Sequence, residues 1–173
     1  MKRTDLLAAT LLAAAAATQP ASAQTLGEDA GACTGGRGPA IQAEITGLKD
    51  RTGRLKLELY PATEEDFLKD DRDLLKEGKT FRRIWANTPP SGPVILCIRV
   101  PAPGEYAVLF THDRDGKNKF NFWSDGAGFP SNQRLGRSRP KLRQAMVRVG
   151  NGVTTVNIRA QYLRGLGGFS PLD

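Results

Sequence analysis

The chain has 173 residues, with 25 Lys and Arg against 18 Asp and Glu, and its formal net charge is +7. This length fits a single domain with its own hydrophobic core. The chain holds one histidine and two cysteines, and the absence of a C-x-x-C spacing argues against a cysteine-based metal or redox site.

The first 23 residues have the pattern of a secretory signal peptide. Lys2 and Arg3 precede an apolar run over residues 6–17, and an A-x-A cleavage signal ends at Ala23. The run is shorter than the roughly 20 apolar residues that span a bilayer, and no later stretch approaches that length. We therefore expect cleavage after Ala23, a periplasmic or secreted location, and no transmembrane segment after processing.

The mature chain is predicted to be one domain between two looser ends. Residues 24–39 are rich in glycine and poor in apolar side chains, which is typical of a flexible lead-in. Residues 40–164 are predicted to form the domain, and residues 165–173 a C-terminal tail. Cys33 and Cys97 are expected to pair in an oxidising compartment, with two free thiols as the alternative.

The first half of the domain is predicted to contain a hairpin and a helix. Polar and apolar residues alternate over residues 41–45 and 55–59, and the turn-forming segment 47–53 lies between them, which predicts a β-hairpin with one buried face. Residues 63–66 have the composition of a helix start. The apolar spacing after them predicts one short amphipathic helix that ends near residues 76–79.

Further strands are predicted from apolar runs between turn signals. We expect a short strand over residues 83–86, a core strand over 94–100 and a central strand over 106–111. Residues 145–149 and 153–162 flank a Gly-Asn-Gly turn and predict a second hairpin. About seven strands with one inserted helix indicate an all-β sandwich.

An oxygen-rich loop follows the central strand. Its candidate binding residues are a histidine, two acids, two amides and a tryptophan: His112, Asp113, Asp115, Asn118, Asn121 and Trp123. Such loops suit hard cations, but no acidic residue is expected to close the far side. We therefore expect Ca²⁺ binding that is absent or no better than about millimolar. Asp113 and Asp115 are instead expected to accept hydrogen bonds from backbone N–H groups of the loop, and His112 to close it by hydrogen bonds.

Four motifs carry a resemblance to a known family. They are P-G-E-Y-A-V at residues 103–108, H-D-R-D-G-K-N-K-F at 112–120, G-F-P at 128–130 and L-G-R-S-R at 135–139. Together they resemble domain-of-unknown-function family 2141, a family of exported bacterial proteins, and the resemblance covers residues 41–163. It implies a small extracytoplasmic β-sandwich of the immunoglobulin-like or transthyretin-like kind, with no established activity.

The last quarter of the chain is basic. No Asp or Glu occurs over residues 131–172, and five of the basic residues there form a candidate anion stripe: Arg134, Arg137, Arg139, Lys141 and Arg143. The last four recur at every second residue, so an extended chain would present them on one side. Pro140 disfavours helix at the residue before it. The stripe, with Arg134 and Trp123 at its edge, predicts an anionic envelope polymer as partner, and a solvated basic strand is the alternative.

These features predict an exported, non-enzymatic structural or binding module of the cell envelope, without cofactor or bound metal. Its partner is expected to be an anionic envelope polymer or another envelope protein, and nucleic acid is not expected. Two alternatives stay open. One is a protein that binds metal or anionic glycan weakly; the other is a hydrolase that uses Asp113, Asp115 and His112.

Overall fold

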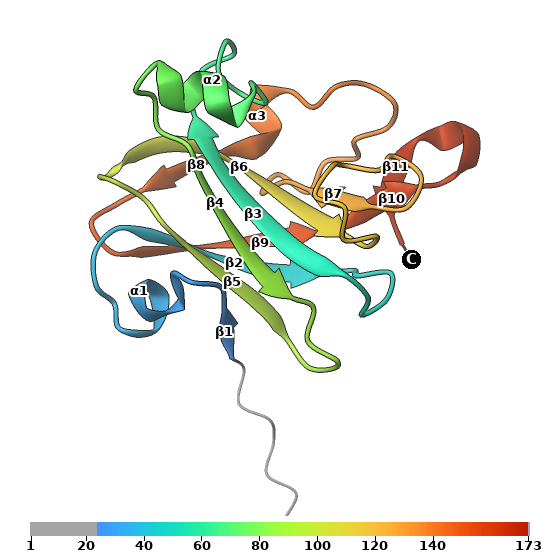
Figure 1. Cartoon of the computed structure of the whole chain (residues 1–173), viewed down its shortest axis with the longest axis horizontal. Coiled ribbons are helices and arrows are strands. Elements are labelled where there is room, and N and C mark those ends of the chain that lie inside the picture. The colour runs from blue at the N-terminus through green and yellow to red at the C-terminus, as the bar shows by residue number, and fades with distance from the viewer. Residues whose placement is uncertain (1–23, 173) are drawn as a thin grey trace, which may run out of the picture.

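The computed structural model describes residues 24–172, and the predicted signal peptide lies outside them. Two β-sheets pack face to face (Figure 1). The smaller sheet has the strand order β1 (Thr25–Leu26), β5 (Val94–Arg99), β2 (Ala40–Thr46) and β9 (Val153–Arg159). The prediction of an all-β sandwich is therefore confirmed.

The larger sheet is centred on the longest strand, β6 (Gly104–Asp113). Its order is β11 (Phe169–Pro171), β10 (Gln161–Leu163), β7 (Gly126–Gly128), β6, β3 (Arg54–Pro61) and β4 (Arg82–Asn87). β8 (Met146–Val149) also pairs with β6. The structure has more strands than the seven or so predicted because β1, β7, β10 and β11 are only two or three residues long.

The core lies between the two sheets and follows the alternation in the sequence. Leu55, Leu57 and Leu59 of β3 are fully buried beside Val108 and Phe110 of β6. They pack against apolar residues of the smaller sheet: Ile41, Ala43, Ile45, Leu96, Ile98 and Ile158. Each fully buried Leu, Ile, Val or Phe side chain contributes about 1.5–3 kcal/mol to folding, so this cluster contributes strongly to stability.

Both predicted hairpins are wrong. β2 and β3 lie in different sheets, because β2 pairs with β5 and β9 while β3 pairs with β4 and β6. β8 and β9 are likewise separated. The alternation indicated correctly which face of each strand is buried. The alternation does not distinguish a strand paired in the same sheet from a strand of the other sheet across the core, because both arrangements bury the same side chains.

The predicted inserted helix is shorter than expected. Phe67 N–H donates to the carbonyl of Thr63, which closes one turn, and Leu68 then has a left-handed backbone with φ of 63°. This conformation ends the turn. α2 (Asp71–Lys76) begins only after Asp70, whose side chain accepts a hydrogen bond from Arg72 N–H. Two further short helices occur, α1 (Ala30–Thr34) and α3 (Leu142–Ala145).

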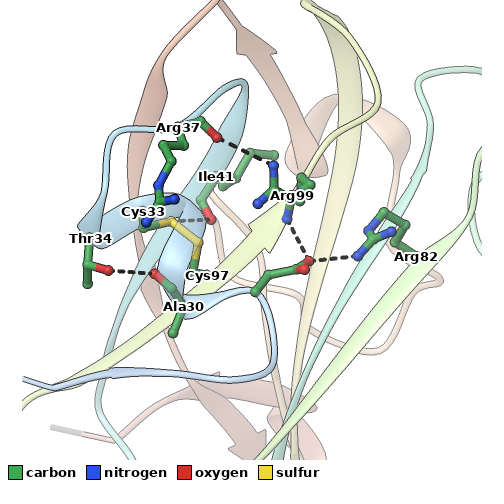
Figure 2. The surroundings of a disulfide bond; sticks show 9 residues. Ala30, Cys33, Thr34, Arg37, Ile41, Arg82, Cys97 and Arg99 are labelled. Atoms are coloured by element: carbon green, nitrogen blue, oxygen red, sulfur yellow. Dashed lines mark hydrogen bonds and ion pairs between the residues drawn. A yellow bond between two sulfur atoms is a disulfide. The ribbon is translucent and has the colours of Figure 1, made fainter.

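The segment predicted to be a flexible lead-in is part of the fold. β1 runs parallel to β5, and Cys33 of α1 forms a disulfide with Cys97 of β5 over a Cα–Cα distance of 6.1 Å (Figure 2). Asp29 accepts hydrogen bonds from the side chain of Arg82 and the backbone N–H of Arg99. These contacts anchor the glycine-rich segment to the sandwich, although its few apolar side chains could not do so alone.

The predicted C-terminal tail is also ordered. A 3₁₀ turn (Gly165–Gly167) leads into β11, which pairs with β10. Phe169 is buried and forms a bridge with Gly136. Among residues 24–172, no helix combines the length and hydropathy that crossing a membrane requires.

A candidate ligand cavity and an acidic loop

The outer face of the larger sheet, turned away from the core, is only partly covered. One end is covered by a second apolar cluster that includes Tyr60, Leu74, Phe129 and Leu142, to which α2 and α3 contribute. Figure 1 shows these two helices together at that end of β3. The middle of the face stays open, and a cavity of about 450 Å³ lies there. This volume falls within the range of small-molecule sites.

The floor of the cavity is the outer face of β3, β6 and β7, and its walls come from segments far apart in the chain. Lys56, Glu58, Leu109, Thr111 and Ala127 form the floor. The apolar walls include Tyr60, Leu68, Phe120, Phe122, Phe129, Leu135 and Phe169. A ligand here would gain most of its binding energy from burial of apolar surface.

The aromatic wall nearest to solvent is built by two segments. Phe120 and Phe122 belong to the loop after β6, and both pack on Phe169, with ring centroids at 5.9 and 4.9 Å. Each of the two loop side chains is still nearly half exposed. Trp123 is 80% exposed and does not line the cavity. The predicted pairing of Trp123 with the basic stripe is therefore not part of this site.

A compensated charge lies in the floor. The carboxylate of Glu58 is buried, and it accepts a hydrogen bond from Arg83 at 2.7 Å and lies 3.2 Å from Nζ of Lys56. Lys56 in turn lies over the ring of Trp85, with Nζ 5.6 Å from the centroid. Two cations thus surround one acid, so the floor does not repel a negatively charged ligand.

The predicted basic stripe is not an extended strand. Residues 137–141 are irregular, and α3 begins directly after them, so Arg143 lies on a helix. Pro140 permits this helix because it lies before the first turn, where no helical hydrogen bond is lost. Lys141 N–H donates to Gln144 Oε1 at 2.8 Å, and this hydrogen bond caps the N-terminus of α3. The period of two that would align the four cations along a strand is therefore absent.

The structure nevertheless brings two residues of the stripe to the cavity. Arg137 and Arg139 line its rim, whereas Arg134, Lys141 and Arg143 do not line it. Arg139 donates to the carbonyls of Phe67 and Leu68 at 3.4 and 3.5 Å. Arg137 is exposed, and it takes part in none of the hydrogen bonds or ion pairs among residues 24–172. Its guanidinium group is free to bind an anion.

His112 lies on the opposite face of the sheet, inside the core. Its Nε2–H donates to the carbonyl of Thr52 at 2.8 Å, and its Nδ1 lies 2.7 Å from the hydroxyl of Tyr162. Burial lowers the pKa of His112, which favours the neutral ring. Both ring nitrogens are engaged and the side chain has no exposed surface, so the geometry gives His112 a structural role.

Asp113 and Asp115 of the loop after β6 accept the backbone hydrogen bonds expected from the sequence, whereas His112 bonds to Thr52 and Tyr162 and does not close the loop. Asp115 accepts from Lys117 N–H and from the side-chain amide of Asn121. Asp113 accepts from Asn118 N–H and from Arg54. These bonds fold residues 113–121 into a compact turn.

The expectation that no acid closes this loop is wrong. Asp125 is buried at the far side and accepts hydrogen bonds from the backbone N–H groups of Arg114 and Asn121. Each of Asp113, Asp115 and Asp125 has an oxygen that could bind a metal, and these oxygens lie within 4.8 Å of one another. Asp125 was missed because the loop is longer than the standard Ca²⁺ pattern. The only local signal is its position directly before the glycine-rich β7.

The fold and the site define a class of protein: a small disulfide-bonded β-sandwich with an apolar cavity on the outer face of one sheet. Residues 43–157 match the family described as uncharacterized protein conserved in bacteria, DUF2141, and the chain belongs to this family. The resemblance inferred from the motifs is thereby confirmed. No curated protein and no solved structure matches the chain.

Proposed function

We propose that the protein is an exported, non-enzymatic binding module of the bacterial cell envelope, and that its ligand is an anionic envelope molecule with an apolar portion. The cavity on the outer face of the larger sheet carries this proposal. It joins aromatic walls to an exposed arginine, Arg137, that has no partner among the described residues. An amphipathic anion would place its apolar part against Phe120, Phe122 and Phe169 and its charge at the rim.

The surroundings of the cavity favour binding over catalysis. The one carboxylate in the floor, Glu58, is engaged in ion pairs with Arg83 and Lys56 and is not free to approach a ligand. The hydrolase alternative requires His112, which lies on the other face of the sheet with both nitrogens engaged. General acid–base catalysis requires a group that can reach the substrate, and the cavity lining includes no histidine.

Two features support export. The first 23 residues have the composition of a signal peptide. The disulfide between Cys33 and Cys97 is of the kind that persists in oxidising compartments. An envelope location would also supply ligands that combine acyl chains with phosphate or carboxylate groups.

The proposal is tested with a fluorescent amphipathic anion, 1-anilinonaphthalene-8-sulfonate, and with octyl phosphate and octanol as competitors. We expect the anion to bind and octyl phosphate to displace it at lower concentration than octanol does. A charged hydrogen bond contributes about 1.5–3 kcal/mol. Arg137→Ser should therefore lower the affinity for octyl phosphate about tenfold or more and leave the affinity for octanol unchanged.

Two further variants complete the test. Arg143→Ser removes another exposed arginine, one that does not line the cavity, and the affinities of this variant should match those of the wild type. Leu109→Trp fills the floor and should abolish binding of all three compounds. Equal affinity in the wild type and Leu109→Trp would disprove the cavity as the site, and equal losses in Arg137→Ser and Arg143→Ser would disprove the role of Arg137.

A further inference from the structure

The acidic loop contains a cluster of oxygen ligands that the proposed function does not use. Asp113, Asp115 and Asp125 place one carboxylate oxygen each within 4.8 Å of the others. Asp113 and Asp125 are buried, at 3% and 1% exposure, and the side chain of Asp115 is partly open to solvent, at 21% exposure. None of the three lines the cavity. Three carboxylates at this separation repel one another unless a positive charge lies between them.

A second observation indicates that something is missing from this cluster. Oδ1 of Asp113 is buried and accepts no hydrogen bond within the described part of the chain. The other oxygen of the same carboxylate accepts from Arg54 at 3.0 Å and from Asn118 N–H at 3.3 Å. A buried carboxylate oxygen without a partner is costly in free energy. A ligand with positive charge would compensate it.

We propose that Asp113, Asp115 and Asp125 bind a Ca²⁺ ion. The donor set consists of oxygen atoms alone, which selects hard cations over the metals that prefer nitrogen or sulfur. Ca²⁺ tolerates an irregular ligand arrangement completed by carbonyl groups and water, whereas Mg²⁺ demands a near-ideal octahedron and keeps most of its water. One buried side, one open side and an irregular loop fit Ca²⁺ better.

The nearby cations set the affinity. Arg54 remains paired with Asp113, and Nζ of Lys117 lies 3.7 Å from Asp115 Oδ2. Both oppose a divalent ion, but the side chain of Lys117 is 76% exposed and can turn away. The dissociation constant should therefore lie at about 10⁻⁴–10⁻³ M, the range of extracellular Ca²⁺ modules. Asp125, the third carboxylate, makes the site stronger than Asp113 and Asp115 alone would.

Isothermal titration calorimetry with CaCl₂ on the chelator-treated, full mature protein tests the site. We expect one ion per chain in this affinity range and weaker binding of MgCl₂. Asp115→Asn and Asp125→Asn should each lower the affinity for Ca²⁺ about tenfold or more, since each removes one charged ligand. Lys117→Gln should raise the affinity for Ca²⁺ several-fold, because this substitution removes a competing cation. A purely structural role of the loop would not produce this last effect.

Glu105→Gln is the matched control, because it removes an acid of β6 that pairs with Arg148 outside the cluster, and its Ca²⁺ affinity should equal that of the wild type. The thermal unfolding of each variant without Ca²⁺ shows whether it folds, and Asp115 is the safer substitution because it is less buried than Asp125. Two results would overturn the site: no heat and no rise in unfolding temperature for the wild type at about 10 mM Ca²⁺, or unchanged affinity in both Asp115→Asn and Asp125→Asn.

Discussion

The hydroxyl of Tyr162 and Nδ1 of His112 lie 2.7 Å apart inside the sandwich and connect β10 to β6. Because Nε2–H donates to the carbonyl of Thr52, Nδ1 of the neutral ring is the acceptor, and the Tyr162 hydroxyl is the donor. Burial lowers the pKa of His112 and raises the pKa of Tyr162 to about 12. Protonation of His112 would break this arrangement.

We predict that stability falls when the pH drops below about 6.5, the ordinary pKa of histidine. The pKa of His112 is depressed in the folded state, so the unfolded chain binds the proton first and acid favours unfolding. Urea unfolding at pH 7 and pH 5 measures this difference. His112→Gln should be less stable at pH 7 and should lose most of the change between the two pH values. The same change in wild type and variant would contradict the prediction.

The disulfide should account for a large share of the stability. Cys33 and Cys97 are 64 residues apart, and closing a loop of that length stabilises the folded state by about 4 kcal/mol in the chain-entropy account. The double variant Cys33→Ser/Cys97→Ser should therefore unfold at markedly lower urea concentration. The wild type under reducing conditions is the control, since it should shift by a similar amount. No shift in either sample would show that the bridge contributes little.

Gly168→Ala should destabilise the C-terminal hairpin. Gly168 has φ of 73°, and an added Cβ would lie 2.2 Å from the carbonyl oxygen of Gly136. Strain of this backbone conformation alone is worth about 1–3 kcal/mol. Gly150→Ala is the control, because its φ is not positive and no atom lies within 4 Å of the added Cβ. Equal unfolding midpoints for the two variants would refute the close approach of the two backbones.

The mature protein is predicted to begin at Gln24. Expression of the whole chain with export and intact-mass measurement of the product tests this directly. The expected mass corresponds to the chain from Gln24 with two hydrogens fewer than the reduced form, and it should increase accordingly after reduction. A product that retains residues 1–23 would contradict both the cleavage site and the proposed location.

The sequence predicted local structure well where one signal dominates. Residues 94–100 and 106–111 are largely apolar on both faces, and the structure places residues 94–99 in β5 and residues 106–111 in β6. The turn in which the Asp115 carboxylate accepts a hydrogen bond from Lys117 N–H is a local preference of the aspartate side chain. Such features depend on neighbours within a few residues, so the order of the amino acids is enough to indicate them.

The pairing of strands and the cavity depend on residues far apart in the chain. Lys56, Phe122 and Arg137 line the same space, although no local pattern connects them. The basic residues around Pro140 predicted a strand because they recur at every second position, which is the period of side chains on one face of a strand. The apolar contacts of Leu142 and Ala145 favour a helix instead. Tertiary packing of this kind overrides a local pattern.

The parallel pairing of β2 with β9 has a consequence for the order in which the molecule can form. β2 pairs along its whole length from Ala40 to Thr46, and its partner occupies residues 153–159. A chain whose synthesis stops before Val153 therefore has β2 with one row of unpaired backbone groups. Exposed strand edges of this sort recruit strands from other molecules. Until residues 153–159 have paired with β2, the nascent protein exposes the edge of a strand that is internal in the finished sheet, and such an edge favours aggregation.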